Sequence, residues 1–315
     1  MMAELVIGSR GSELALWQAR WVVSRIIETN PGMSCRIEII TTTGDRQTDA
    51  PLAKIGDKGL FVKEIELALL NGQIDVAVHS AKDLPSEMDG SLYIAAFPKR
   101  EDPRDALVSK AGKLNELPKE AVIGTSSVRR RAQIMAVRPD VKIVDLRGNL
   151  DTRLRKLCGS EYDAIILACA GLRRMSLECR ITEALPIEVS LPAAGQGALA
   201  VQCRRGDPAA DIVSNLDDAL TRRCVSAERA VLAALGAGCQ TPVGAHAREI
   251  DGRLVLDALV AGLDGSRIVR KSISGELDEW NDLGIRLAGS LLESGARDLL
   301  EDARRSEASG NIGAA

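Results

Sequence analysis

Four arginines stand at positions from which a protein can bind a small anion. Arg129 and Arg130 follow the segment GTSS at the end of a predicted strand, and Arg147 follows the predicted strand VKIVDL in the same way. Arg153 lies about one helical turn further along the chain. Ligands bind at the carboxyl ends of strands in open α/β sheets, and guanidinium groups pair with carboxylates and phosphates. This spacing therefore predicts an anion site.

Positive charge is concentrated in the same part of the chain. Residues 98–196 contain 18 lysines and arginines against 13 acidic residues, a net charge of +5, whereas the whole chain carries −3, which leaves −8 for the remainder. Such segregation indicates an anion-binding domain, although a solvated basic face would give the same count. Helices predicted to begin at Ser127 and after Asn149 would add backbone N–H donors at this edge, which favours the anion site.

The anion is not expected to be nucleic acid. Aromatic residues make up only 2% of the chain, so few side chains could stack on bases, and a net charge of −3 opposes broad phosphate binding. The sequence also contains no GxxxxGK[ST] phosphate loop. The residues alone therefore indicate a carboxylate-binding α/β protein.

A carboxylate and an amine follow another predicted strand. In HSAKDLP, Asp83 lies just past the strand DVAVHS, with Lys82 beside it. Asp83 is a candidate catalytic carboxylate, but an aspartate at a strand end can equally be a turn or capping residue. His79 is interpreted as a structural histidine. Because His79 and His246 are the only histidines, a histidine triad or a multi-histidine metal site has few residues to draw on, and no metal ion is expected.

Residues 41–61 are predicted to form a long loop. The segment TTTGDRQTDAPLAKIGDKGLF has no sustained periodicity, carries Lys54 and Lys58 among Gly, Asp and Pro, and ends at Phe61. Loops longer than about 12 residues inside compact domains are usually lids, binding loops or disordered segments. A lid is therefore as good an interpretation as an inert linker.

The cysteines predict a reducing compartment. Seven cysteines without a CxxC pair argue against a disulfide framework and a zinc site, so a cytoplasmic protein is expected. Cys239 lies among small residues in GAGCQTPVG, at a predicted helix–strand junction, where a large group could be attached to its sulfur. Alternatively it is a buried small hydrophobe, which is the interpretation for the other six. The N-terminus lacks a signal-peptide pattern and no apolar stretch approaches about 20 residues, so no membrane partner is expected.

The elements around these residues predict an α/β fold in several parts. The chain has 315 residues, more than one core of about 100 to 150 residues would need. Strand and helix patterns alternate in the first hundred residues, where Ser12 is predicted to cap an amphipathic helix that runs to Glu28. They alternate again after PKREDPRD, residues 98–105, which is predicted to cross between domains. The last hundred residues are predicted to form a smaller α+β domain, with hairpins at the Asp-Gly pairs 251–252 and 264–265 and a closing helix from about Leu283 to Arg304.

Nine segments, in order, closely resemble the porphobilinogen deaminase family, whose members are also called hydroxymethylbilane synthases. These segments are IGSRGSELALWQA, TTGDRQTDAPLAKIGDKGLFVKE, DVAVHSAKDLP, REDPRDALVS, IGTSSVRRRAQ, LRGNLDTRL, YDAIILACAGLRR, LPAAGQGALAVQCR and GAGCQTPVGAHA. The resemblance runs from about residue 4 to residue 300. It departs from the family at Gln202, where an acidic residue is expected in most relatives.

The resemblance implies the fold. Two α/β domains similar to those of periplasmic binding proteins are expected to face each other across a cleft, with a smaller C-terminal α+β domain beside them. The expected boundaries are residues 1–97 with 197–216 for domain 1, 98–196 for domain 2 and 217–315 for domain 3.

The resemblance also implies the site. Cys239 is expected to carry a dipyrromethane cofactor through a thioether, and Asp83 is expected to be catalytic with Lys82. The cofactor is expected to be bound by Arg129, Arg130, Arg147, Arg153, Ser127 and Asn149. The substrate porphobilinogen is expected to be bound by Arg10, Ser12, Arg147, Arg153, Arg174 and Gln196. The lid loop is expected to include Lys54, Lys58 and Phe61.

The activity that the resemblance implies is the head-to-tail condensation of four porphobilinogen molecules into hydroxymethylbilane, with release of ammonia. A monomeric cytoplasmic enzyme is expected, with no metal, nucleic acid or membrane as partner. Two other functions remain open at this stage: a two-lobed carboxylate-binding protein without catalysis, and a nucleic-acid-binding regulator. A covalent cofactor at Cys239 would exclude the first alternative, and the absence of salt-dependent DNA binding would exclude the second.

Overall fold

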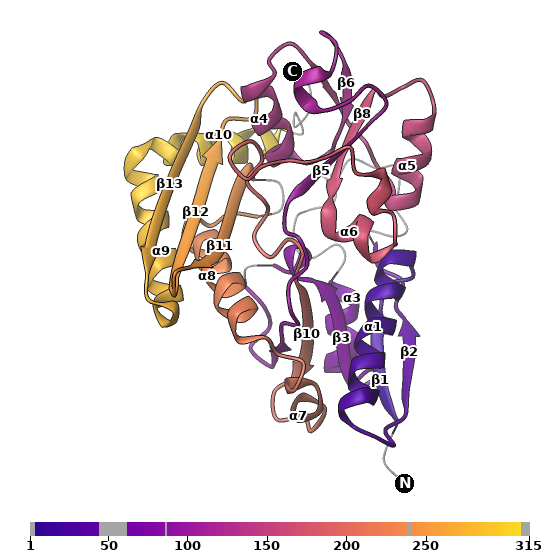
Figure 1. The fold of residues 1–315 in the computed structure, drawn as a ribbon. Helices are drawn as coiled ribbons and strands as arrows, with labels where there is room; N and C mark the ends of the chain where they lie inside the picture. The colour runs from indigo at the N-terminus through magenta and orange to yellow at the C-terminus, as the bar shows by residue number, and fades with distance from the viewer. Residues whose placement is uncertain (1–3, 44–61, 86, 239–240, 310–315) are drawn as a thin grey trace.

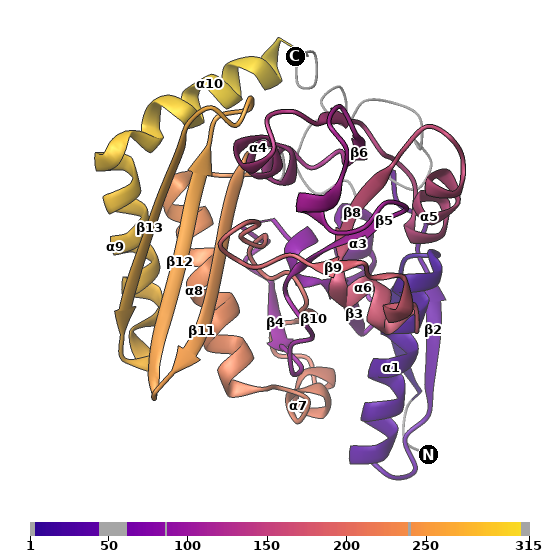
Figure 2. The same cartoon turned by 45° about the horizontal axis from the view of Figure 1, so that its top comes forward.

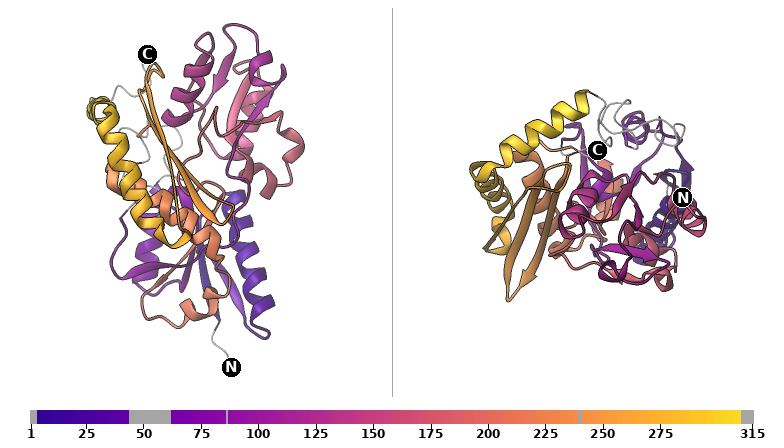
Figure 3. Two further views of the ribbon diagram at one scale, coloured as in Figure 1. Left: turned by 60° about the vertical axis from the view of Figure 1, so that its left-hand side comes forward. Right: turned by 90° about the horizontal axis from the view of Figure 1, so that it is seen from above.

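The computed structural model describes residues 4–43, 62–85, 87–238 and 241–309, whose helices and strands form three units, each built on its own sheet (Figure 1). Two units are lobes with five-stranded sheets, and the third has a three-stranded sheet. The third unit lies beside the two lobes, as the views in Figures 1 and 3 agree. The mixed α/β architecture expected from the sequence is confirmed.

Lobe 1 is built on a sheet with the strand order β2-β1-β3-β10-β4. Its strands are β1 (Leu5–Ser9), β2 (Cys35–Ile39), β3 (Val76–Ser80), β4 (Leu92–Ala96) and β10 (Leu199–Arg204), and its helices are α1 (Glu13–Thr29), α3 (Lys63–Leu70) and α7 (Ala209–Ser214). β1 is parallel to β2 and β3, whereas β10 is antiparallel to β3 and β4. The chain therefore returns to lobe 1, more than a hundred residues after β4, to fill the gap between β3 and β4.

Lobe 2 repeats this topology in the order β7-β6-β8-β5-β9. Its strands are β5 (Asp105–Ser109), β6 (Val122–Gly124), β7 (Lys142–Val144), β8 (Ala164–Ala168) and β9 (Glu183–Ala184), and its helices are α4 (Val128–Val137), α5 (Leu150–Cys158) and α6 (Cys169–Arg174). β6 is parallel to β7 and β8, and β5 is antiparallel to β8 and β9. In each lobe the antiparallel strand is the first one after the chain crosses from the other lobe.

The third unit is a meander of β11 (Val243–Ile250), β12 (Arg253–Ala261) and β13 (Ile268–Gly275) with α8 (Ala219–Leu235), α9 (Trp280–Leu291) and α10 (Arg297–Ala308). Figure 2 shows α8 and α9 on one side of this sheet and α4 of lobe 2 on the other. The predicted tight hairpin at 251–252 is confirmed, because Asp251 and Gly252 both have positive φ and Ile250 pairs with Arg253. The second Asp-Gly pair lies in a longer connection between Ala261 and Ile268.

The closing helix was expected to be continuous, and this expectation is wrong. The helical segment begins at Trp280 and is interrupted at residues 292–296, where Gly295 has a φ of 94°. A left-handed residue turns the chain and separates α9 from α10. A glycine can adopt this conformation without the steric cost that a side chain would add.

The two segments by which the chain crosses between the lobes lie side by side. The first crossing, residues 97–104, joins β4 to β5, and the second crossing, residues 185–198, joins β9 to β10. The backbone N–H of Glu101 donates to the carbonyl of Gly197 over 3.1 Å, and Arg100 Nε donates to the carbonyl of Gln196 over 2.8 Å. Gly197 has a φ of +88°, and a Cβ at this position would lie 2.4 Å from the Glu101 carbonyl oxygen. Only glycine fits here, because both its backbone conformation and its close approach to the first crossing exclude a side chain.

A buried carboxylate of the third unit holds both crossings. Glu228 of α8 is fully buried, and Arg100 donates to both of its oxygens over 2.6 and 3.1 Å. The backbone N–H groups of Gly195 and Ala247 donate to the same carboxylate over 2.6 and 2.8 Å. Burial alone would raise the pKa of Glu228, but the charge of Arg100 and contact with His246 lower it to about 2. One ionised side chain thus ties the third unit to both crossing segments.

Within the described residues, no helix combines the length and apolar character that crossing a membrane requires.

Replacing Glu228 with Ala should decrease the free energy of unfolding by about 3–5 kcal/mol, because the charge of Arg100, whose side chain is only 10% exposed, would lose its buried partner. Urea denaturation would measure the change. Asp302→Ala is the control, since it removes one partner of an exposed ion pair with Arg305 and should change the free energy by less than about 1 kcal/mol. Equal effects of the two substitutions would contradict the role assigned to Glu228.

Candidate functional site

Asp83 and Lys82 lie at the carboxyl end of β3, in a single 3₁₀ turn formed by Ala81–Asp83. The turn is held against the second crossing, because the N–H of Ala81 donates to the carbonyl of Ala198 over 3.0 Å. Gly195 packs so closely on this turn that a Cβ would meet the Ala81 backbone at 3.0 Å. The second crossing therefore fixes the position of the turn from which the Asp83 side chain extends.

A pocket opens beside this turn. Its lining includes Arg10, Ser12, Gln18, His79, Ser80 and Asp83. Arg10 and Ser12 follow β1, which pairs with β3, so the carboxyl ends of two neighbouring strands form the pocket. Ser12 also caps α1, as predicted, by accepting from the N–H of Ala15 over 3.3 Å. The structure thus brings together three predicted site residues from two separate segments of the sequence.

His79 forms a neutral wall of the pocket. Its Nε2 lies 3.0 Å from Oε1 of Gln202, and the Gln202 amide donates to Glu66 over 2.8 Å. Burial lowers the pKa of His79 to about 4; the hydrogen bond with Gln202 opposes this change and the charge of Arg10 adds to it. The His79 imidazole is therefore uncharged at neutral pH, and the Gln202 amide that binds it is uncharged as well.

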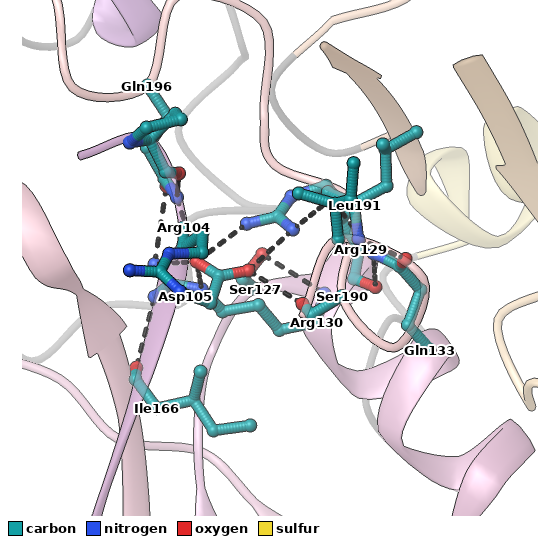
Figure 4. Close-up of polar contacts among 12 residues, drawn as sticks. Arg104, Asp105, Ser127, Arg129, Arg130, Gln133, Ile166, Ser190, Leu191 and Gln196 are labelled. Carbon is teal, nitrogen blue, oxygen red and sulfur yellow. Dashed lines mark hydrogen bonds and ion pairs between the residues drawn. The ribbon is translucent and has the colours of Figure 1, made fainter. Parts of the chain in front are cut away.

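Arg129 and Arg130, on α4 of lobe 2, are both buried and bind the carboxylate of Asp105 (Figure 4). Arg129 Nη1 donates to Asp105 over 2.8 Å, and Arg130 Nε donates to it over 2.9 Å. Burial would raise the pKa of Asp105, but the two arginines hold it well below its usual range. The sequence interpretation missed Asp105. One feature of the sequence could have identified it: an aspartate at the first position of the apolar strand DALVS, in a domain with a net positive charge.

Charged groups of the two lobes interact at this place. Burial lowers the pKa of Lys82 to about 8, while the charge of Asp83 raises it and that of Arg130 lowers it. Burial likewise lowers the pKa of Arg153 to about 10, with Arg130 lowering it further and Asp83 opposing. Lys82 of lobe 1 thus senses the charge of Arg130 of lobe 2, and Arg153 of lobe 2 senses the charge of Asp83 of lobe 1. We call these four residues the interlobe cluster.

Ser127 and Asn149 cap the helices that carry the arginines. Ser127 Oγ accepts from the N–H of Arg130 over 3.4 Å, and Asn149 Oδ1 accepts from the N–H of Thr152 over 2.9 Å. Arg153 Nε donates to the carbonyl of Gly148 over 2.8 Å, which directs its guanidinium back toward the connection between β7 and α5. The predicted helix starts are therefore confirmed, and the two polar side chains have local hydrogen bonds.

The structure also describes three other predicted ligands. Arg147 is half-buried, 3.8 Å from Asp145. Arg174 is buried on α6 and donates to the carbonyl of Gly197 over 2.7 Å, and burial lowers its pKa to about 10. Gln196 is 1% exposed and donates to Asp105 over 2.9 Å. Arg174 and Gln196 therefore contact the crossing segments, outside the pocket that Asp83 lines.

Lys54, Lys58, Phe61 and Cys239 lie outside the described residues. The predicted helix–strand junction around Cys239 is confirmed on both sides, since α8 ends at Leu235 and β11 begins at Val243.

The other six cysteines differ in exposure. Cys169, Cys203 and Cys224 are buried, and burial raises the pKa of each to about 12. Cys35 is half-buried, whereas Cys158 and Cys179 are exposed. The expectation that all six are buried is wrong for the last two, because Cys158 ends the amphipathic helix α5 and Cys179 lies in a surface 3₁₀ turn.

Comparison with known proteins gives two matching family models. Residues 5–211 match "Porphobilinogen deaminase, dipyromethane cofactor binding domain" and residues 222–293 match "Porphobilinogen deaminase, C-terminal domain". Curated porphobilinogen deaminases from Desulforamulus reducens and Pelotomaculum thermopropionicum are 47% and 50% identical over 309 residues. Each alignment covers 98% of this chain, and 100% and 99% of the respective relatives. Among solved structures, a substrate-binding domain of a putative amino acid ABC transporter from Streptococcus pneumoniae is similar with a TM-score of 0.43 and 13% identity, covering 68% of this chain and 91% of that one.

Stability should depend on pH through His79. Its pKa is about 4 in the folded chain, below the ordinary value of about 6.5, so the unfolded chain binds a proton first as the pH falls. The stability that depends on a neutral His79 is fully present above the ordinary pKa of about 6.5. As the pH falls from about 6.5 to about 4, the free energy of unfolding should decrease by about 1.4 kcal/mol per pH unit. Urea unfolding of the wild type and His79→Gln across pH 4 to 7 would isolate this slope. His246→Gln should retain it, and parallel curves for the wild type and His79→Gln would refute it.

Proposed function

Since this chain belongs to the porphobilinogen deaminase family, we propose that Asp83 is the carboxylate that carries its chemistry and that the surrounding cations hold its carboxylate-bearing ligands. The chain is a transferase of tetrapyrrole biosynthesis: it condenses four porphobilinogen molecules head-to-tail into hydroxymethylbilane, releases ammonia, and uses a dipyrromethane cofactor.

The interlobe cluster is the observation that carries this proposal. Asp83 is one carboxylate among Lys82, Arg130 and Arg153, and it lines a pocket with Arg10 and Ser12. A pyrrole that bears an acetate and a propionate presents two negative charges and one N–H donor. The cluster offers the complementary set, with several cations for the carboxylates and one carboxylate for the N–H.

The same donor set fits the dipyrromethane, which bears four carboxylates. We propose that Arg130, Arg147 and Arg153 bind these carboxylates, together with Arg129 and the helix starts at Ser127 and Asn149. The bound dipyrromethane supplies the pyrrole carbon to which the first substrate is joined.

Substrate binding is assigned to residues of both lobes. Arg10, Ser12, Arg147, Arg153, Arg174 and Gln196 are proposed to contact porphobilinogen. Arg10 and Ser12 are the best supported of these, because they share the pocket with Asp83. Buried guanidinium groups bind carboxylates strongly, since water competes little for them.

Asp83 is proposed to stabilise positive charge. When the aminomethyl group of porphobilinogen leaves as ammonia, the pyrrole that remains is a cation, with the charge shared by its nitrogen. A carboxylate that accepts the pyrrole N–H stabilises this cation, and it can relay the proton released when the new carbon–carbon bond forms. Lys82 is predominantly protonated at neutral pH, since its pKa is about 8, and is proposed to act beside Asp83 as a cation that attracts substrate carboxylates.

We assign the cofactor attachment to Cys239, through a thioether. The position of the α8–β11 junction supports this assignment, because α8 carries Glu228 and is thereby tied to both crossings. Sheet membership supports the proposed boundaries of residues 1–97 with 197–216, 98–196 and 217–315. Lys54, Lys58 and Phe61 are assigned to a lid loop. The proposed enzyme is a cytoplasmic monomer without nucleic acid or membrane partners.

Replacing Asp83 with Asn should lower kcat by at least about 100-fold while leaving the fold and the cofactor in place, because the amide cannot stabilise a cation through negative charge. Steady-state kinetics on protein of verified mass would measure the effect. Asp89→Asn, an exposed substitution in the same lobe, should leave kcat unchanged. A folded, cofactor-loaded Asp83→Asn protein with wild-type turnover would remove Asp83 from the mechanism.

The purified chain should be heavier than its sequence by two linked pyrrole units, and the added mass should map to the peptide that contains Cys239. Cys239→Ser should lack most of this mass, because an alcohol is a weaker nucleophile than a partly ionised thiol. Cys158→Ser is the control, since Cys158 is an exposed cysteine that is not proposed to carry the cofactor, and it should retain the adduct. Unmodified wild-type protein from cells that make porphobilinogen would contradict the cofactor assignment.

A further inference from the structure

Asp105 is a fully buried carboxylate at the start of β5, and four side chains converge on it (Figure 4). Two are Arg129 and Arg130 from α4. The other two come from the second crossing, where Ser190 Oγ donates over 2.7 Å and Gln196 Nε2 donates over 2.9 Å. The carboxylate therefore joins the first strand after one crossing to the other crossing and to the arginine pair.

These contacts fix the direction of both guanidinium groups. Arg129 Nη1 binds Asp105 Oδ2 and also donates to the carbonyl of Leu191 over 2.6 Å. Arg130 binds Asp105 Oδ1 through Nε at 2.9 Å and Nη2 at 2.7 Å, and its Nη1 donates to the carbonyl of Ile166 over 3.0 Å. A guanidinium bound along one edge by a carboxylate keeps its plane and its remaining donors in one orientation.

Asp105 also reduces the net positive charge of the arginine pair. Arg129 and Arg130 together carry +2, and Asp105 reduces this to +1. Lys82 of lobe 1 senses all three groups: Asp105 raises its pKa, and the two arginines lower it. The charged groups that alter the pKa values of Lys82 and Arg153 are Arg129, Arg130, Asp83 and Asp105. Without the negative charge of Asp105, Asp83 would be the one carboxylate in this set, against the four cations Lys82, Arg129, Arg130 and Arg153.

We propose that Asp105 is a positioning residue of this enzyme: it acts as the internal counter-ion that orients Arg129 and Arg130 for the carboxylates of the cofactor. Asp105 is buried, so it acts through the arginines and does not itself contact a ligand. This inference rests on the proposed function, which makes the arginine pair a carboxylate-binding site.

Glu228 provides a matched control. It is also a fully buried carboxylate, it also pairs with an arginine, and it also binds the second crossing through Gly195. However, neither Lys82 nor Arg153 senses its charge among the principal contributions to their pKa values. If Asp105 only stabilised the crossings, Asp105→Asn and Glu228→Gln should have the same consequences.

The first measurement is the fraction of chains that carry the cofactor, by intact mass spectrometry of soluble protein from cells that make porphobilinogen. In Asp105→Asn this fraction should fall below about one tenth of the wild-type value, because the asparagine amide presents a donor to arginines that need an acceptor. Glu228→Gln should load normally for each folded chain, although it should unfold at a lower urea concentration. Equal loss of loading in the two variants would overturn the proposal.

The second measurement does not depend on loading. In the Cys239→Ser background, lysines labelled by reductive ¹³C-methylation can be titrated by NMR, with Lys82 assigned by its loss in Lys82→Gln. The titration midpoint of Lys82 should be lower in Asp105→Asn than in the background and unchanged in Glu228→Gln. An unchanged Lys82 midpoint in Asp105→Asn would also overturn the proposal.

If Asp105→Asn does not fold, the double variant Asp105→Asn with Arg129→Gln removes one charge of each sign and keeps the net charge of the pair. It should fold and still load poorly, because Arg130 has lost the carboxylate that orients it; normal loading would overturn the proposal. The wild type distinguishes a failure of the cofactor assignment from a failure of the role proposed for Asp105. A wild type without the adduct contradicts the cofactor assignment, whereas a loaded wild type with a loaded Asp105→Asn variant contradicts only the role of Asp105.

Discussion

The pairing of the two crossing segments is the constraint on which the arrangement of this molecule depends. Two buried carboxylates maintain it. Glu228 reaches the crossings from the third unit, and Asp105 reaches them from lobe 2. A buried charge is tolerated only when it is paired and hydrogen-bonded, so each carboxylate requires its partners to stay together. The relative position of the lobes and the third unit is thereby tied to a small number of ionic contacts.

The repeated topology explains why the site belongs to both lobes. Each sheet places the carboxyl ends of its parallel strands toward the other lobe's charged residues, so Asp83 and Lys82 after β3 interact with Arg130 and Arg153 of α4 and α5. Positive charge is supplied mainly by lobe 2, in agreement with the excess of basic residues between positions 98 and 196. The proposed catalytic carboxylate, Asp83, is supplied by lobe 1. A ligand with several carboxylates and a cationic reaction centre needs both contributions.

Among the described residues, those of the third unit support the crossing segments and do not line the pocket. Its helix α8 binds the crossings through Glu228 and leads directly into the segment that contains Cys239. On its other side, Ala132 and Leu191 of lobe 2 pack with Leu259 and Ala261 of β12 in one apolar cluster. The unit is therefore attached to the same crossing segments that support the turn of Asp83 and the arginine pair.

Local patterns in the sequence were sufficient for features that depend on a few neighbouring residues. Ser12 caps α1, the Asp251–Gly252 pair makes a hairpin, and Asp83 follows β3, because caps, turns and strand periodicity act over short distances along the chain. The segments that resemble the family added the expectation of two α/β domains and a smaller C-terminal α+β domain. The resemblance implied that residues 197–216 belong to domain 1, but only the tertiary structure decided that β10 pairs between β3 and β4. Only the tertiary structure, too, decided that Asp105 has hydrogen-bond partners 24 to 91 residues away in the sequence. The physical reason is that a buried charge is stabilised by whatever the fold brings to it, and partners so distant in sequence leave no local pattern beside the residue they bind.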